Sequence, residues 1–157
     1  PDSRYAMLAL TNFITPDCIV HHLQATDAQG AITELVHHLA ATGRIDDAET
    51  IIEAVWTREQ QRSTGIGDGI AVPHGRCEHM DQIVAAIGTA DPAIDFQASD
   101  GKADNLVVLL VSPTRNTTLH VQALGAISRR LSHAEIRRRL RNCPDAGCVY
   151  DVLCRAD

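Results

Sequence analysis

Apolar residues near the start of the chain recur at the spacing of an α-helix. Within residues 26–43, one helical face collects Ile32, Leu35, Val36 and Leu39. Thr26 and Gln29 have the spacing of a capping box, and Gly43 suits the C′ position after the last turn. The segment therefore predicts an amphipathic helix.

Residues 46–61 predict a second amphipathic helix. Asp46 or Asp47 is expected to cap it, and further acidic side chains fill its first turn, where the helix dipole favours them. Its buried face is expected to hold Ile51, Ile52, Val55 and Trp56.

Two short apolar runs, "QIVAAIGTA" (82–90) and "NLVVLLVSP" (105–113), have no helical period. The second run is too continuous for a half-exposed strand and too short for a typical helix, because a strand with one wet face alternates apolar and polar residues. It therefore predicts a central strand that is covered on both faces.

The rest of the chain returns to helical patterns. Thr117 or Thr118 is expected to cap a helix over residues 117–132, and its inner stripe holds Leu124, Ile127 and Leu131. Two more helices are predicted over residues 134–142 and 144–155, the latter with Pro144 in its first turn. Helices mixed with sheet-core strands indicate a layered α/β fold, and 157 residues suit a single compact domain.

Composition narrows the functional classes. A net charge of -6 argues against nucleic-acid binding, which needs an excess of Lys and Arg, and aromatic residues make up only 3% of the chain. No apolar run approaches the length of a membrane span, so direct membrane insertion is not expected. The five cysteines include no C-x-x-C pair, and we interpret them as reduced thiols of a cytoplasmic protein: Cys18, Cys77, Cys143, Cys148 and Cys154.

Basic residues gather near the C-terminus. The cluster consists of Arg129, Arg130, Arg137, Arg138, Arg139 and Arg141. Two interpretations are open: a solvated helical face, or a docking rim for an acidic partner.

The stretch "STGIGDGIAVPHGR" (63–76) carries the candidate chemistry. Glycines let backbone amides approach an anion closely, which suggests phosphate. A P-loop is excluded because the only lysine, Lys102, lies elsewhere, and the glycine spacing does not match a dinucleotide fingerprint. Because Pro73 favours an extended chain before it, we expect a strand end that presents His74.

Several residues complete a set of groups suited to phosphoryl chemistry. His120 lies in the first turn of its predicted helix, where the dipole disfavours an imidazolium and welcomes a phosphate. Arg62 supplies a guanidinium next to the hydroxyls of Ser63 and Thr64. The pairs His21–His22 and His37–His38 put adjacent side chains on different faces, so we predict neither a metal site nor a cofactor.

These residues carry a family resemblance. "REQQRSTGIGDGIAVPHGR" closely resembles the motif of the fructose/mannitol-type enzyme IIA domains of the bacterial phosphoenolpyruvate-dependent phosphotransferase system, which include the nitrogen-regulatory branch called PtsN. "AITELVHHLAATGRIDDAETIIEAVWTRE" is similar to the opening helices of that family. "ADNLVVLLVSP" and "LHVQALGAISRRL" are similar to its core strand and second-histidine helix. The resemblance spans about residues 8–155.

The resemblance implies a fold, a reaction and partners. The fold is a mixed β-sheet with helices on both faces, over residues 8–157, and we expect residues 1–7 to be an N-terminal extension. His74 matches the histidine that accepts a phosphoryl group from phospho-HPr or an HPr-like carrier, His120 matches the second active-site histidine, and Arg62 matches the arginine that contacts the group. The glycine loop is expected to help bind it, through Ser63, Thr64, Gly65, Gly67 and Gly69.

Three roles remain open within this resemblance. A regulatory, PtsN-like protein signals by binding targets according to its phosphorylation state, whereas a sugar-transport component passes the phosphoryl group to a IIB domain. Asp68 stands where the family usually has Asn, which would put a carboxylate near the incoming group. It keeps open a third role, an adaptor that has the same fold and is not phosphorylated.

Overall fold

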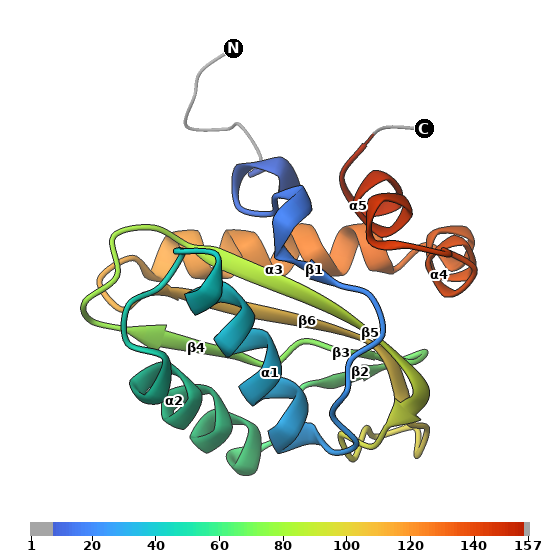
Figure 1. The fold of residues 1–157 in the computed structure, drawn as a ribbon, viewed down its shortest axis with the longest axis horizontal. Coiled ribbons are helices and arrows are strands. Elements are labelled where there is room, and N and C mark those ends of the chain that lie inside the picture. Colours follow the sequence, from blue (N-terminus) through green and yellow to red (C-terminus); the bar gives the residue numbers. More distant parts are fainter. Residues whose placement is uncertain (1–7, 156–157) are drawn as a thin grey trace.

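The computed structural model describes residues 8–155, so the predicted extension at 1–7 lies outside the described residues (Figure 1). The strands are β1 (Ile19–Val20), β2 (Gly65–Gly67), β3 (Ile70–Ala71), β4 (His74–Cys77), β5 (Val84–Ile94) and β6 (Asp104–Pro113). They form one sheet in the order β1-β5-β6-β3-β2, and β4 also pairs with β6. Parallel and antiparallel pairs both occur, which confirms the mixed sheet.

The helices are α1 (Ala28–Ala41), α2 (Ala48–Gln61), α3 (Thr117–Leu131), α4 (Ala134–Arg141) and α5 (Ala146–Cys154). Two 3₁₀ turns precede them, Leu10–Asn12 and Pro16–Cys18. Every predicted helix is therefore present. Within residues 8–155, none of these helices is long and apolar enough to cross a membrane.

Successive residues of β4 show that helices cover both faces of the sheet. A Cβ on Gly75 would lie 2.9 Å from the Val55 side chain of α2, so the absent side chain is what lets α2 pack here. The preceding His74 contacts His120 of α3 instead. Because adjacent strand residues point to opposite faces, α2 and α3 lie on opposite sides of the sheet. Figure 1 shows α1 and α2 side by side on one of them.

Strand β6 is the centre of the core, as its apolar run predicts. Val107, Leu109 and Leu110 are fully buried, and the strand pairs with β5 on one side and with β3 and β4 on the other. Burial on both faces explains why its sequence does not alternate.

The predicted caps of two helices are wrong by one or two residues. The cap of α1 is Asp27 rather than Thr26, and the cap of α3 is Asn116 rather than Thr117 or Thr118. In both helices, the chosen side chain accepts a hydrogen bond from the amide three residues later. Asp and Asn are at least as good N-caps as Thr. Asp27 also has the extended backbone that an N-cap requires.

Of the other predictions about helix ends, two are confirmed and one is wrong. Asp47 caps α2, and Gly43 follows the end of α1 with a φ of 77°, as predicted. Pro144 does not lie in the first turn of α5, because Asp145 caps that helix and Pro144 precedes the cap.

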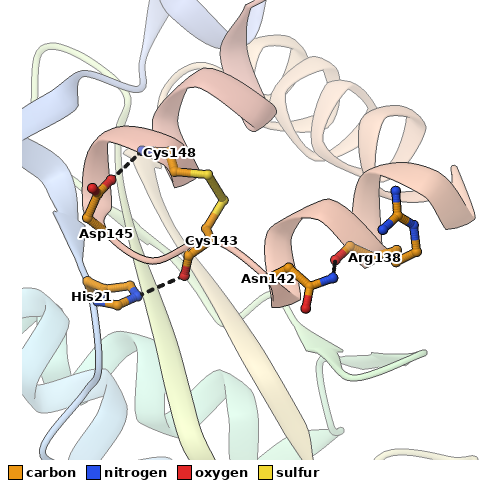
Figure 2. The surroundings of a disulfide bond; sticks show 6 residues. All are labelled: His21, Arg138, Asn142, Cys143, Asp145 and Cys148. Carbon is orange, nitrogen blue, oxygen red and sulfur yellow. Dashed lines mark hydrogen bonds between the residues drawn. A yellow bond between two sulfur atoms is a disulfide. The ribbon is translucent and has the colours of Figure 1, made fainter.

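The structure corrects the prediction that all cysteines are reduced. Cys143 and Cys148 form a disulfide (Figure 2). Cys143 follows α4 and Cys148 lies in the first turn of α5, and the short connection brings the two Cα atoms to 5.4 Å, a normal separation for a disulfide. A spacing of five residues gave no C-x-x-C motif, so only the turn reveals the pair. Cys18, Cys77 and Cys154 are free thiols.

Candidate phosphoryl-transfer site

His74 lies at the start of a strand rather than beyond the end of one. β3 and β4 run parallel to the same neighbour, β6, and Pro73 separates them. The carbonyl of Pro73 still accepts a hydrogen bond from the Leu110 amide, at 3.0 Å. The expected presentation of His74 is therefore achieved by a second short strand, whose pairing with β6 fixes the backbone on which the imidazole is mounted.

The tautomer of His74 follows from the hydrogen bond that its Nδ1 makes. Nδ1 lies 2.8 Å from the carbonyl oxygen of Val72, which can only accept, so Nδ1 carries the proton. Nε2 is left with its lone pair. Burial lowers the pKa of His74, the bond to Val72 opposes this shift, and the charge of Arg58 adds to the lowering. A neutral imidazole with a free Nε2 is a nucleophile.

His120 lies beside it and is also neutral. The two rings are 5.3 Å apart between centroids and inclined by 56°. His120 is buried, as its place at the edge of the inward stripe predicts, and its Nδ1 hydrogen-bonds to the hydroxyl of Ser112 on β6. Burial lowers the pKa of His120 to about 4, with smaller contributions from His74, Arg76 and Arg58. Neither ring therefore carries a charge at neutral pH.

The guanidinium groups that act on these rings belong to Arg58 and Arg76, which the sequence analysis missed. Arg76 follows His74 by two residues on β4, so both face the same side of the sheet. Its Nη2 donates to Thr117 at the start of α3, while its buried Nε has no hydrogen-bond partner within residues 8–155. Because side chains alternate along a strand, the sequence could have indicated that Arg76, two residues after His74, lies on the same face.

Arg58 lies one turn before Arg62 on α2. Its Nη1 donates to the Arg62 carbonyl at 2.9 Å, and its charge lowers the pKa of both His74 and His120. Arg62 itself is exposed at the C-cap of α2. The structure thus brings Arg58 into electrostatic contact with the histidines, and the role of Arg62 in phosphoryl binding stays a prediction.

The hydroxyls of the glycine loop make hydrogen bonds to other groups of the protein. Thr64 donates from its amide and its hydroxyl to the carboxylate of Glu59, which is buried. The Ser63 hydroxyl donates to the Phe96 carbonyl and accepts from the Gly65 amide. These contacts hold the loop in shape. The phosphoryl-binding role predicted for the loop is not tested by this geometry.

Glycines and Asp68 form the turn between β2 and β3. Gly67, Asp68 and Gly69 all have positive φ, at 89°, 58° and 82°. Asp68 precedes Ile70, which pairs with Leu106, whereas His74 pairs with Leu110. The separation along β6 is about 13 Å. The carboxylate of Asp68 therefore lies at the other end of this segment, not beside the imidazoles.

The arginine cluster of the C-terminal region is largely engaged within the fold. Arg130 donates to the carbonyl of Val152, Arg137 to the carbonyls of Leu131 and Ser132, and Arg138 pairs with Glu135. Arg130 and Arg137 thus satisfy carbonyl groups at helix ends, which is a structural use of their charge. The cluster is not one continuous rim of free cations.

Two neutral imidazoles beside two guanidinium groups have the features that histidine-based phosphoryl transfer needs, which are a nucleophile and fixed positive charge. Within residues 8–155, no three His, Cys, Asp or Glu side chains come together as metal ligands.

Comparison with known proteins agrees with that class. The family model for "Phosphoenolpyruvate-dependent sugar phosphotransferase system, EIIA 2" matches residues 12–155. The chain therefore belongs to the EIIA type-2 family, whose members are phosphoryl-carrier components of the phosphotransferase system.

Relatives within the family fall into two groups. The nitrogen regulatory protein of Bradyrhizobium diazoefficiens is 32% identical over 93% of this chain and 95% of its own length. The fructose-specific EIIABC component of Bacillus subtilis is 28% identical over 96% of this chain, which spans only 24% of that larger protein. Among solved structures, the nitrogen regulatory protein IIA-Ntr of Neisseria meningitidis superposes with a TM-score of 0.82 at 27% identity, over 88% of this chain and 94% of its own.

Proposed function

We propose that this chain accepts a phosphoryl group on Nε2 of His74, from phospho-HPr or an HPr-like carrier. The observation that supports this most directly is the hydrogen bond from Nδ1 to Val72, because it leaves Nε2 as the nucleophilic nitrogen. His120, at 5.3 Å between ring centroids, supplies a second neutral imidazole next to the acceptor.

The transfer is a single displacement at phosphorus. The Nε2 lone pair of His74 forms the new P–N bond, and the electron pair of the breaking P–N bond returns to the imidazole of the carrier. Nδ1 of His74 keeps its proton, so the phosphorylated ring is cationic and the Val72 carbonyl stabilises it. The effect of Arg58 and Arg76 on the pKa of His120 supports a role for them in balancing the charge on the transferred oxygens, which is the main contribution a protein makes to phosphoryl transfer.

Regulation is the role that we propose. The nitrogen regulatory relative matches over 93% of this chain and 95% of its own length, a fuller match than that of the fructose-specific EIIA component of Haloferax volcanii, which covers 80% of this chain and 81% of its own length. We therefore propose that the phosphorylation state of His74 controls which target proteins the chain binds. The second candidate is sugar transport with a IIB domain as the acceptor, which the fructose-specific relative supports.

Intact-mass spectrometry at alkaline pH tests the phosphorylation step. After incubation with phosphoenolpyruvate, enzyme I and HPr-type carriers, the wild type should gain one phosphoryl group and His74→Ala none. His79→Ala is the matched control, because His79 is an exposed histidine of the following loop, and it should be labelled like the wild type. Full labelling of His74→Ala would reject His74 as the acceptor. Absence of labelling in the wild type with every cognate carrier would favour the adaptor role.

Affinity capture with the phosphorylated and unphosphorylated protein separates the two roles. Capture of a kinase or transporter subunit in one state alone supports regulation. Exclusive capture of a IIB protein supports transport.

A further inference from the structure

A cavity of about 330 Å³ lies away from the histidine pair. Neither His74, His120 nor Arg58 is among the residues that line it. It lies on the same side of the sheet as α3: Ser112 of β6 contacts His120, and Leu106, six residues earlier, lines the cavity with the same strand parity. The cavity therefore occupies the opposite end of the sheet face that carries the phosphoryl-transfer site.

Cationic side chains from α4 line the cavity. Arg137 is largely buried, with 17% of its side chain exposed, and its Nη2 lies 3.8 Å from the Asp68 carboxylate. Arg141 contributes a second guanidinium, which has no hydrogen bond or ion pair among residues 8–155. Lys102 lines an adjoining hollow together with both arginines. Because Asp68 is paired with Arg137, the exposed Asp91 is the remaining carboxylate at the cavity.

The floor and the opposite wall of the cavity are apolar. They are formed by Ile70, Leu106 and Leu140, which are buried residues of β3, β6 and α4. Ala90 and Ala93 of β5 add small side chains and leave the space open. An apolar body would be desolvated here, while an attached anionic group would reach the guanidinium of Arg141.

His21 and His22 also line the cavity, and fixed contacts hold their imidazole rings in place. The rings of His21 and His22 stack at 4.0 Å, contrary to the expectation that they face apart, because the chain bends after β1 and His22 has a φ of 68°. Figure 2 shows His21 donating through Nε2 to the Cys143 carbonyl, at 3.2 Å, next to the Cys143–Cys148 disulfide. This wall is therefore preformed, as ligand cavities usually are.

Two residues with unusual backbone conformations line the same cavity. Among residues 8–155, the non-glycine residues with positive φ are His22, Asp68 and Gln97, and the first two line this cavity. Unfavourable backbone conformations persist where the surroundings enforce them, and they concentrate at ligand sites.

We propose that this cavity is a second binding site, which takes a small organic carboxylate with an apolar body. The carboxylate pairs with Arg141, which has no hydrogen bond or ion pair to the other described residues, and the body lies against Ile70, Leu106 and Leu140. Guanidinium groups bind carboxylates in a planar, two-pronged geometry, and a volume near 330 Å³ is at the lower end for small-molecule sites.

An NMR titration of the unphosphorylated protein with sodium benzoate tests this proposal. Benzoate should cause saturable shifts of the Gly69, Ala90 and Leu106 amides, and benzylammonium at the same ionic strength should not. Arg141→Gln should weaken benzoate binding at least fivefold. The matched control is Arg138→Gln on the same helix, because Arg138 pairs with Glu135 outside the cavity and the change in net charge is the same.

A second variant tests the space rather than the charge. Ala93→Trp fills the cavity while both arginines remain, and it should abolish the shifts. Equal affinities of the Arg141→Gln and Arg138→Gln proteins, shifts that never saturate, or an equal response to benzylammonium would each overturn the proposal. The titration needs no phosphorylation, so a His74→Ala protein should bind benzoate normally whether or not His74 is the acceptor.

Discussion

A titratable side chain is buried at each end of strand β6. One of these side chains has a hydrogen-bond partner, and the other has none among residues 8–155. At the C-terminal end, the buried His120 has a hydrogen-bond partner in Ser112 and a pKa of about 4. At the N-terminal end, Asp104 is fully buried, and neither of its carboxylate oxygens has a hydrogen-bond partner within residues 8–155. Burial raises the pKa of Asp104 to about 7, and the charges of Asp100, Asp95 and Glu59 add to this shift.

Burial favours the neutral form in both places, but the consequence depends on the type of group. The neutral form of an imidazole is its nucleophilic and hydrogen-bonding form, so burial prepares the histidine end for chemistry at neutral pH. The neutral form of a carboxyl group is an acid, so burial makes the Asp104 end sensitive to a rise in pH. The candidate phosphoryl-transfer site and a group expected to make stability depend on pH therefore lie at opposite ends of one strand.

The largest expected effect concerns the cations at the histidine end. Arg58→Gln should slow phosphorylation of His74 by about 100-fold, because removing one fixed donor from a developing anion costs that much in other enzymes. Arg62→Gln is the matched control, one turn later on the same helix, and should stay within about threefold of the wild type. Single-turnover labelling with phospho-HPr measures both rates. The opposite ranking would show that Arg62 is the phosphoryl-binding arginine.

The next effect is the pH dependence of stability at the other end. The folded pKa of Asp104 is raised from 3.8 to about 7, so its contribution to stability is complete below about pH 4 and is lost as the pH rises through 7. Between pH 5 and 7 the ionisation of Asp104 should remove about 2 kcal/mol of unfolding free energy from the wild type relative to Asp104→Asn, at 1.36 kcal/mol per pH unit. In Asp104→Asn this loss should disappear. Urea denaturation at both pH values measures it.

An exposed acid provides the control for this comparison. Asp81→Asn removes a carboxyl group that lies on the surface beside Arg115, and it should leave the loss of stability between pH 5 and 7 unchanged. If Asp104→Asn shows the same loss as the wild type, then Asp104 is ionised in the folded protein and the contrast between the two ends of β6 fails.

A smaller effect is expected when His120 loses its partner. Ser112→Ala leaves the Nδ1 of a buried ring without its hydrogen bond and should lower the free energy of unfolding at pH 7 by about 1 to 2 kcal/mol. Ser128→Ala, at an exposed position of α3, should change it by less than about 0.5 kcal/mol. Equal effects of the two substitutions in urea denaturation would mean that Ser112 does not hold His120.

The smallest effect is a shift in the titration of the two histidines. Because burial and Arg58 lower the pKa of His74, its NMR titration midpoint should fall below 6.5, and that of His120 should lie near 4. Both rings should therefore be neutral at pH 7. A midpoint above 6.5 for His74 would mean that its bond to Val72 outweighs burial.

Much of the site was predictable from local sequence. His74 and His120 were singled out as candidates because a proline after a short apolar run and a position in a helix's first turn are local signals, and the structure brings their rings next to each other. The arginines were harder. Arg62 is closer to the glycines in sequence, but α2 ends there with its side chain exposed, and Arg58, one turn earlier, is the one whose charge reaches the rings.

Other predictions also failed because closeness in the folded protein does not follow from closeness in sequence. Cys143 and Cys148 meet because the connection between α4 and α5 brings their Cα atoms to 5.4 Å. The carboxylate of Asp68 was expected near the phosphoryl group, since few residues separate it from His74, yet an extended chain carries them to opposite ends of one sheet face. Distance along a strand grows with every residue, so nearness in sequence is a poor guide there.

The sequence pattern alone determined the helices, the central strand β6 and the layered α/β class, and it singled out His74 and His120 as candidates, because periodicity and turn residues act over a few neighbouring positions. Only the tertiary structure decided which nitrogen of His74 is free, which arginines act on the rings, and that Asp104 is buried without a partner. Those properties depend on desolvation and on charges from α2, α3, β4 and β6 together, and such contacts exist only once the layers have packed.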